Sequence, residues 1–211
     1  MLLIDSGGQA ALALRADWGA NEARSAASAP GSQDAQGRSH GGRVMSVRSL
    51  ELNGQAVTPP PAQTWGKTRP PAGVDGYLGW GWLSQQRWVL DYRAQHLQLL
   101  GTEDPLPASC GALPQRFELL GSLPYLRLST ADGTPLALGL DSGASRNVVR
   151  TEQAALVSGP LHWGGQTLAA GDFASAPLQL PVIAGFLGQD FLSRHRVCVD
   201  PQQRLLWVQP L

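Results

Sequence analysis

The sequence predicts an all-β protein made of two similar halves. Strand signals are short and frequent, helical signals are scarce, and segments of the first half recur in order in the second. Gly (25 residues) and Pro (16 residues) favour turns over long helices. Four apolar or alternating runs bounded by turn residues are expected as strands, at 97–100, 117–120, 125–128 and 205–208.

The recurring segments predict the domain organisation. Four pairs match in the same order: 4–8 with 140–144, 50–55 with 161–166, 77–83 with 186–192, and 89–99 with 198–208. Between the copies, a stretch with three prolines is typical of a linker. We therefore predict an N-terminal half at 1–100, a linker at 101–116 and a C-terminal half at 117–211.

Turn and helix signals occupy matching places in the two copies. Asn53-Gly54 is a strong hairpin signal, and Gly164-Gly165 stands at the same place in the second copy. The segment 131–134 is expected as a turn between strands. One or two helical turns are expected after each Leu-Gly, at 80–86 and 189–195.

The two copies differ in two places. The first is longer between its Asp-Ser-Gly and its Leu-Gly, and the surplus around 19–42 is rich in Ala, Ser and Gly, which predicts a long loop or hairpin. In the second copy, strands at 123–129 and 135–140 precede the Asp, whereas only Met1–Ile4 do so in the first. The first half therefore lacks one strand. A start upstream of Met1, a trimmed chain and a sheet with an exposed edge all stay open.

Composition and charge exclude several classes of partner. Lys plus Arg and Asp plus Glu number 16 each, so no excess of cations exists to neutralise nucleic-acid phosphates or an anionic membrane. No apolar run approaches the ~18 residues of a membrane span, and Asp5 ends the first apolar run too early for a signal peptide. We expect neither a nucleic-acid partner nor a membrane span. Localisation stays open, with an exported, periplasm-like setting preferred.

The pattern with most chemical content is an apolar strand running into Asp-Ser-Gly, twice. Such a strand delivers a carboxylate at its end, Ser bonds backbone or the partner loop, and Gly permits a tight turn. If two such loops meet across a pseudo-two-fold axis, their carboxyl groups face each other. Two adjacent carboxyls cannot both ionise, so the pair shares one proton. One carboxylate then activates a water while its protonated partner polarises a carbonyl.

Each Asp-Ser-Gly is followed downstream by an aromatic-Leu-Gly: 5–7 by Tyr77-Leu78-Gly79 and 141–143 by Phe186-Leu187-Gly188. With these two pairs of motifs the chain resembles the retropepsin-like aspartic proteases, the family of pepsins and retroviral proteases. The run Leu187–Leu192 followed by Val199-Asp200 resembles the bacterial branch of the family. The resemblance spans nearly the whole chain outside the linker. It implies a two-lobed acid-protease fold, peptide or protein substrates, no cofactor, no metal, and a monomer that carries both half-sites.

The same resemblance implies roles for particular residues. Asp5 and Asp141 are the expected catalytic dyad of an aspartic endopeptidase. Ser6 and Ser142 are expected to cross-link the two loops through hydroxyl-to-backbone bonds. The other supporting loop residues are Gly7, Gly143, Ala144 and Ser145. A single flap over the cleft is expected within 19–47.

Several alternatives stay open at this stage. Gly8-Gln9 replaces the family's usual Ala-Ser or Ala-Thr in the first copy, which, with the missing strand, leaves room for a catalytically inactive peptide-binding or structural module. A generic β-sandwich binding domain is a second alternative.

The four His share no zinc-ligand spacing, and 139–143 misses the Gly-x-Ser-x-Gly pattern of serine hydrolases by one place. Seven Trp could indicate a sugar-binding face, but five of them lie in or beside apolar segments and are expected in the core or cleft wall: Trp80, Trp82, Trp88, Trp163 and Trp207. Cys110 and Cys198 form either one bridge or two buried thiols.

Overall fold

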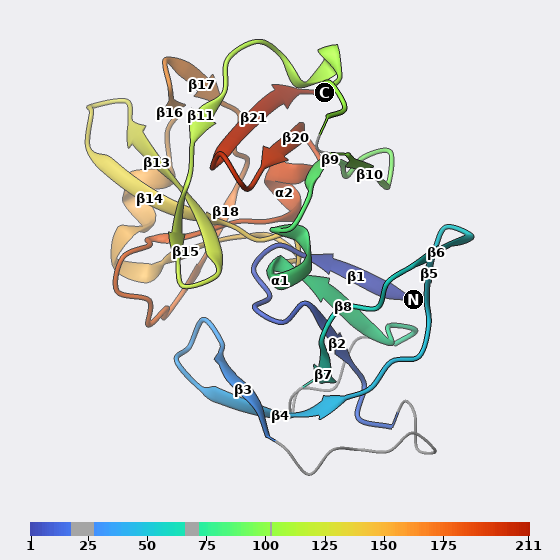
Figure 1. Cartoon of the computed structure of the whole chain (residues 1–211). Coiled ribbons are helices and arrows are strands. Elements are labelled where there is room, and N and C mark those ends of the chain that lie inside the picture. Colours follow the sequence, from blue (N-terminus) through green and yellow to red (C-terminus); the bar gives the residue numbers. More distant parts are fainter. Residues whose placement is uncertain (18–27, 66–71, 102) are drawn as a thin grey trace.

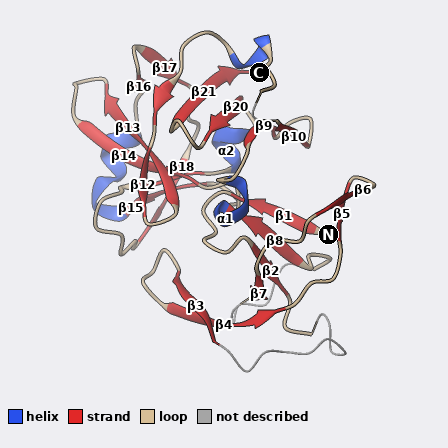
Figure 2. Cartoon of the chain, viewed as in Figure 1, coloured by secondary structure: helices blue, strands red, loops and turns tan. Residues whose placement is uncertain are grey.

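The computed structural model confirms the all-β fold class (Figures 1 and 2). It describes residues 1–17, 28–65, 72–101 and 103–211. Within these residues only two short α-helices occur, α1 (Trp80–Leu83) and α2 (Gln189–Leu192). Both follow a Leu-Gly as predicted, but both end earlier than expected. His195 already belongs to the next strand, because the chain turns back into a sheet after one helical turn.

The segment predicted as the N-terminal half, residues 1–100, contributes a sheet with the order β1-β8-β2-β7-β4-β3 among the described residues. A separate hairpin, β5–β6, stands beside it. The bounds are β1 (Leu2–Asp5), β2 (Leu12–Leu14), β3 (Ser28–Gln33), β4 (Ser39–Met45), β5 (Leu50–Leu52), β6 (Gln55–Val57), β7 (Ala62–Thr64) and β8 (Gly76–Gly79).

The C-terminal half, residues 117–211, contributes a sheet with the order β17-β16-β13-β14-β19-β15-β18, with β12 pairing on β13. The bounds are β12 (Glu118–Leu120), β13 (Leu123–Thr130), β14 (Pro135–Leu140), β15 (Asn147–Arg150), β16 (Leu161–Trp163), β17 (Gln166–Leu168), β18 (Phe173–Ala176) and β19 (Gly185–Leu187). A 3₁₀ helix, Thr151–Val157, which the sequence did not predict, follows β15.

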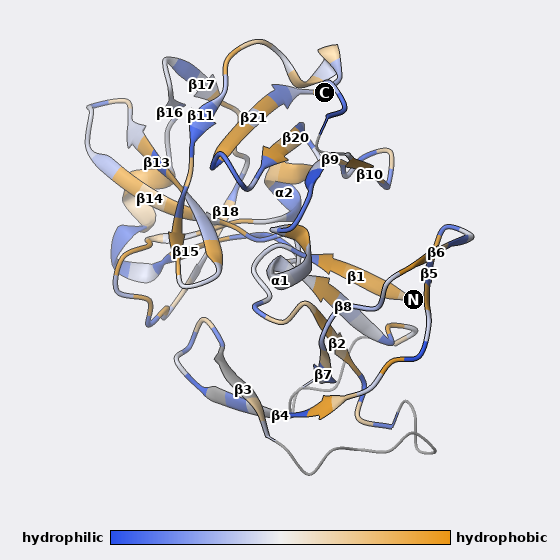
Figure 3. Ribbon diagram, viewed as in Figure 1, coloured by the Kyte–Doolittle hydropathy of each residue, from blue (hydrophilic) through white to orange (hydrophobic). Residues whose placement is uncertain are grey.

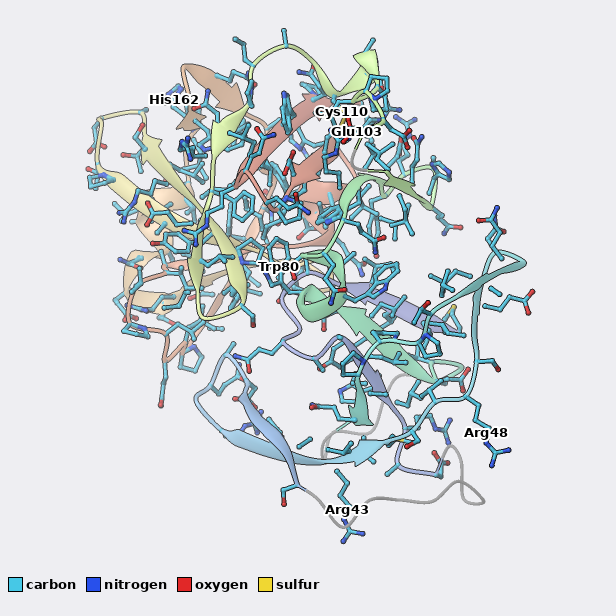
Figure 4. All side chains as sticks on the ribbon, viewed as in Figure 1. Arg43, Arg48, Trp80, Glu103, Cys110 and His162 are labelled. Atoms are coloured by element: carbon cyan, nitrogen blue, oxygen red, sulfur yellow. A yellow bond between two sulfur atoms is a disulfide. The ribbon has the colours of Figure 1, made fainter. Side chains whose placement is uncertain are left out.

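A third sheet joins the two halves, with the order β10-β9-β20-β21-β11. Its strands are β9 (Arg87–Asp91), β10 (His96–Leu100), β11 (Gln115–Arg116), β20 (His195–Asp200) and β21 (Leu205–Pro210). The segment expected as linker thus ends in a strand that pairs with β21. It also holds a 3₁₀ turn, Ala108–Cys110, and a disulfide joins Cys110 (labelled in Figure 4) to Cys198 on β20, which settles the open question in favour of a bridge.

The two halves build their sheets in the same way around each Asp-Ser-Gly. β1 runs parallel to β8, and β2 lies on the other side of β8, antiparallel to it and parallel to β7. In the C-terminal half β14 runs parallel to β19, and β15 lies antiparallel to β19 and parallel to β18. In each half, therefore, the Asp-bearing strand is hydrogen-bonded to the strand that carries the Leu-Gly.

The predicted turns and core residues agree with the structure. Asn53-Gly54 and Gly164-Gly165 close the β5–β6 and β16–β17 hairpins with positive φ at all four residues, the signature of the predicted hairpin turn. The one large core extends through both halves, and Trp80 of α1 (labelled in Figure 4) makes an edge-to-face contact with Phe117 at 5.7 Å between ring centroids. Trp80, Trp82, Trp88, Trp163 and Trp207 are all buried, which fits the core interpretation and not an exposed sugar-binding face.

Candidate active site

The carboxyl ends of β1 and β14 bring the two Asp-Ser-Gly loops together. Asp5 is the last residue of β1, and Asp141 directly follows β14. Each loop then turns tightly, with the amide of Gly8 donating to the Asp5 carbonyl at 3.1 Å and that of Ala144 to the Asp141 carbonyl at 3.2 Å. The two aspartates therefore reach one place from opposite halves of the chain.

Ser6 and Ser142 cross-link the two loops by reciprocal hydrogen bonds. The amide of Ser6 donates to the Ser142 hydroxyl at 3.0 Å, and the amide of Ser142 donates to the Ser6 hydroxyl at 3.0 Å. The hydroxyls in turn donate to carbonyls of the opposite strands: Ser6 to Leu140 at 2.8 Å and Ser142 to Ile4 at 2.7 Å. Both serines are buried, so these bonds form out of contact with water and fix the loops to each other.

These bonds also bear on the serine-hydrolase alternative. A nucleophilic Ser needs a hydroxyl that donates to a base. Both hydroxyls here instead donate to backbone carbonyls inside the protein. The arrangement fits a structural link between the loops rather than a nucleophile.

Gly7 and Gly143 are required for a reason that the sequence did not reveal. Neither has the positive φ expected of a glycine in a tight turn. A Cβ added at Gly7 would lie 2.7 Å from the carboxyl carbon of Asp141, and one added at Gly143 would lie 2.7 Å from that of Asp5. Each glycine thus makes room for the carboxyl group of the opposite half.

The carboxyl groups of Asp5 and Asp141 lie within hydrogen-bonding reach of each other. Burial raises the pKa of Asp5, and repulsion from the Asp141 carboxylate raises it further. Burial also raises the pKa of Asp141, although backbone N–H groups of Gly143 and Ala144 stabilise its charged form. Because the two half-buried carboxyl groups lie close together, they cannot both ionise at ordinary cost, and the pair retains one proton above the usual titration range of a carboxyl.

The C-terminal Asp loop is further braced by a buried asparagine. The Asn147 side chain accepts a bond from the Gly188 amide at 2.8 Å and donates one to the Ala170 carbonyl at 2.6 Å. Its own amide donates to the Asp190 carboxylate at 2.9 Å. Asp190 therefore supports the loop from α2 and does not contribute a second carboxyl pair. The sequence did not indicate this role for Asn147, whose only signal was a polar residue at the start of the strand Asn147–Arg150.

The two aspartates line a cleft of about 540 Å³ between the halves. Its walls include Tyr77 and Phe186, the aromatic residues that precede the two Leu-Gly pairs, so their matched positions were the available signal in the sequence. Trp65, which the sequence analysis did not single out, contacts Tyr77 edge-to-face at 5.2 Å between centroids. Burial, with the charge of Asp5, raises the pKa of Tyr77 to about 12, so the phenol stays neutral.

The β3–β4 hairpin of the N-terminal half extends toward the C-terminal half (Figure 1), and its residues line one side of the cleft. Its tip contributes Asp34, Ala35 and His40 to the lining, and the Ala35 carbonyl accepts a bond from the amide of Gln179 at 3.0 Å. The Asp34 carboxylate is held by Arg38 at 2.7 Å and by His40 at 2.9 Å, and these bonds keep its pKa below the usual range. The hairpin lies within the predicted flap segment 19–47, of which 19–27 fall outside the described residues.

Ser145 and Gln9, the two remaining residues that the sequence drew attention to in these loops, are both exposed. Ser145 is exposed, and the hydrogen bonds that hold Asp141 come from Gly143 and Ala144 instead. Gln9, the departure from the family pattern, lines the cleft with an exposed side chain, while Asp5 is bonded by the Gly7 amide at 3.1 Å. In the described part of the chain, no group of three or more His, Cys, Asp or Glu is arranged to hold a metal, and no helix is long and apolar enough to cross a membrane.

Comparison with known proteins defines the fold. No protein-family model and no curated sequence matches the chain. Among solved structures, the aspartic proteinase from Irpex lacteus is similar with a TM-score of 0.63 over 99% of this chain and 89% of that chain, at 12% sequence identity. The chain thus has the fold of pepsin-like aspartic proteinases, which rules out the generic β-sandwich.

Proposed function

We propose that the chain is an aspartic endopeptidase in which Asp5 and Asp141 activate one water for hydrolysis of peptide bonds. The two carboxyl groups are held next to each other by the surrounding loop residues Ser6, Gly7, Ser142, Gly143 and Ala144. Both half-sites belong to one chain, so the enzyme acts as a monomer.

One observation carries this proposal: two half-buried carboxyls within hydrogen-bonding reach, one from each half, in a cleft lined by residues of both halves. A structural turn aspartate has no need of a like charge beside it, because such a pair costs folding free energy. Raised carboxyl pKa values in a cleft are typical of catalytic sites. The pepsin-like fold adds support at the level of architecture.

The proposed reaction uses the single proton that the pair retains. In the first step the ionised carboxylate takes a proton from the water while the water oxygen bonds to the peptide carbonyl carbon. The protonated carboxyl gives its proton to the carbonyl oxygen, which forms a tetrahedral diol. In the second step the carboxyl that took the water's proton gives it to the amide nitrogen as the C–N bond breaks. The other carboxylate takes a proton from a hydroxyl of the tetrahedral diol, so that an amine and a carboxylic acid are released. The dyad returns with one proton, and no cofactor or metal takes part.

We further propose that the β3–β4 hairpin is the flap that holds an extended peptide against the dyad. Its tip already contacts the C-terminal half through Ala35 and Gln179, so the hairpin and the loop around Gln179 together cover one side of the cleft. A peptide that enters must displace or pass beneath this contact.

The test is hydrolysis of an unfolded protein substrate by the purified chain across pH 3 to 8. We expect activity in the acidic range, and its loss by at least about 1000-fold in Asp5→Asn and in Asp141→Asn, because either change removes the base–acid pair. The matched control is Asp172→Asn, which removes an exposed carboxylate outside the cleft and should leave turnover unchanged.

Undiminished turnover in either dyad variant contradicts the proposal, as does an optimum confined to alkaline pH. Saturable binding of extended peptides with no cleavage at any pH favours the alternative, a catalytically inactive peptide-binding module of the same fold. Circular dichroism spectra of the variants establish that they fold.

A further inference from the structure

The segment 177–183, between β18 and β19, forms one wall of the cleft and is called the wall loop below. The structure describes every residue of this segment, which contains neither a helix nor a strand. Leu180 and Pro181 line the cleft together with the two aspartates. The buried residues of the wall loop anchor it in an apolar cluster of the C-terminal half, made of Tyr125, Leu178, Ile183 and Phe186.

The tip of the β3–β4 hairpin, residues 34–38, rests on the wall loop. Ala35 packs against the apolar cluster, and its carbonyl accepts the bond from the Gln179 amide at 3.0 Å. Gly37 faces the side chain of the same glutamine, since a Cβ added at Gly37 would lie 3.0 Å from the Gln179 Oε1. Figure 3 shows that most of this tip is hydrophilic, so its position depends on the wall loop that presents Gln179.

Arg150, the last residue of β15, holds the wall loop from behind. Its backbone amide donates to the Ala184 carbonyl at 2.7 Å, just before β19 begins. One terminal nitrogen of its guanidinium, Nη2, donates to the carbonyls of Leu180 and Ile183, the latter at 2.9 Å. The Arg150 side chain is 20% exposed and lies outside the lining of the cleft. Arg150 therefore acts on the cleft only through the loop that it holds.

The N-terminal half has an arginine at the matching place but uses its side chain differently. The amide of Arg15 donates to the Asp75 carbonyl at 2.8 Å, just before β8, as that of Arg150 does just before β19. The guanidinium of Arg15 instead pairs with the exposed carboxylate of Asp17, with Nε 2.9 Å from Oδ1. The two arginines thus share a backbone role, whereas the side-chain bonds to a cleft wall belong to Arg150.

We propose that Arg150 is a positioning residue for peptide binding, which fixes the wall loop both as one side of the substrate cleft and as the seat of the hairpin tip. This inference rests on the proposed function of the cleft. A loop that moves freely must be ordered each time a peptide binds, at a cost in conformational entropy, and a loop that is already held costs less. Arginine suits this role because its planar fork loses little freedom for each hydrogen bond that it forms.

The position of Arg150 predicts an effect on binding rather than on the chemical step. The carboxyl groups of Asp5 and Asp141 are held by the serine cross-links and by amides of their own loops, and these bonds do not involve the wall loop. Loss of the Arg150 side chain therefore leaves the two carboxyls in place and loosens the wall and the seat. We expect a higher KM for peptide hydrolysis, with kcat changed by less than about threefold.

The experiment measures binding of a capped, fluorescently labelled octapeptide, Ser-Leu-Thr-Phe-Phe-Thr-Leu-Ser, whose central amide is reduced to a methylene amine so that it is not cleaved. In Arg150→Ala the dissociation constant from anisotropy should rise at least about fivefold, because the wall must then be ordered on binding. In Arg150→Lys it should rise less, because lysine keeps a donor that reaches one of the two carbonyls. The matched control Arg15→Ala should leave it unchanged.

Two further measurements separate positioning from a general loss of stability. Hydrogen exchange of the Gln179 amide should become faster in Arg150→Ala and not in Arg15→Ala, because its bond to the Ala35 carbonyl opens more often when the wall loop is loose. With the cleavable form of the octapeptide, Arg150→Ala should raise KM by about the same factor as the dissociation constant.

The inference is overturned if the uncleaved peptide does not bind, or if Arg150→Ala changes neither the dissociation constant nor the Gln179 exchange. An equal loss in Arg15→Ala also overturns it, as does a fall in kcat with KM unchanged, which would place the effect on the dyad. If circular dichroism shows that Arg150→Ala does not fold, Arg150→Lys decides the same comparisons. The proposed function fails separately: binding that Arg150→Ala weakens, without cleavage of any peptide, means that Arg150 positions peptides in a catalytically inactive module.

Discussion

The two halves present the same pair of residues, an aspartate and a serine, but support them differently. The C-terminal loop is held by the Asn147 side chain and by Asp190 on α2. At the equivalent places the N-terminal half has Ala11 and Gly81, and the Ala11 carbonyl accepts the Gly79 amide at 3.1 Å. A Cβ at Gly81 would lie 2.9 Å from the Ala11 amide nitrogen, so close backbone packing replaces the side-chain bonds.

Comparison of the two halves separates features that both carboxyl groups need from features that support only one loop. The serine cross-links and the two glycines beside the carboxyls are reciprocal, because each half uses them to accommodate the other. Within the described residues, side-chain bracing of the loop and a second strand beside the Asp-bearing strand are found only in the C-terminal half. The hairpin that lines the cleft, β3–β4, belongs to the N-terminal half. The contacts between the halves are thus reciprocal, whereas the support behind each loop differs between the halves.

The reciprocal glycines provide the first and largest test of this comparison. Gly7→Ala pushes a methyl group against Asp141, and Gly143→Ala pushes one against Asp5. Because displacement of a reacting group by about 1 Å costs about 100-fold in rate, each variant should lose at least about 100-fold in kcat/KM for peptide hydrolysis. Exposed Gly159→Ala, which has open space around it, is the control. A large loss in one variant and none in the other would show that the two sides are not equivalent.

Removal of the one-sided brace should cost stability in the C-terminal half. Asn147→Ala leaves the Gly188 amide and the Ala170 carbonyl without their buried partner. We expect the free energy of unfolding, measured by urea denaturation, to fall by about 2–4 kcal/mol. Ser145→Ala, an exposed change two residues away, should cost less than about 0.5 kcal/mol. Equal costs for the two variants would refute a bracing role for Asn147.

The serine pair should show nearly equal single effects and strong coupling. Ser6→Ala and Ser142→Ala each remove one hydroxyl that both donates and accepts across the loops. Each should lower the free energy of unfolding by about 1–3 kcal/mol. The double variant should cost less than the sum, because the two hydroxyls belong to one network. Additive effects would mean that the cross-links act independently.

The smallest expected effect is on the pH dependence of stability. Burial raises the pKa of both aspartates, so above the ordinary carboxyl pKa the folded chain binds more protons than the unfolded chain. This contribution is complete in acid and is lost as pH rises, with a slope of at most about 1.4 kcal/mol per pH unit for one retained proton. Asp5→Asn should flatten the slope between pH 5 and 7, and Asp172→Asn should not. The same slope in Asp5→Asn as in the unsubstituted chain would argue against a shared proton.

The sequence predicted the parts of the structure that depend on local pattern. The Asp-Ser-Gly loops, the Leu-Gly strands that pair with them, the Asn53-Gly54 turn and the cross-bonding of Ser6 and Ser142 were all expected from residues close together in the chain or repeated in it. Among the described residues β1 pairs only with β8, whereas β14 pairs with both β13 and β19, and the sequence predicted this difference because the second copy served as a reference.

What the sequence did not predict depends on packing between distant segments. Whether Cys110 pairs with Cys198 is decided by where β20 passes the linker, and spacing alone gave no sign of it. Trp65 and the tip of the β3–β4 hairpin reach the cleft only because the chain folds back over it. The reason for Gly7 and Gly143 likewise lies in the opposite half, where the neighbouring carboxyl occupies the space of a side chain.

The central claim is that the two halves together hold one carboxyl pair with one shared proton. Infrared difference spectroscopy near pH 6.5 tests it directly, because ordinary carboxyls are ionised there and a retained proton gives a carboxylic-acid carbonyl band. We predict this band in the unsubstituted chain and in Asp172→Asn, and its loss in the double variant Asp5→Asn/Asp141→Asn. Identical spectra for the unsubstituted chain and the double variant, with no such band in either, would contradict the account.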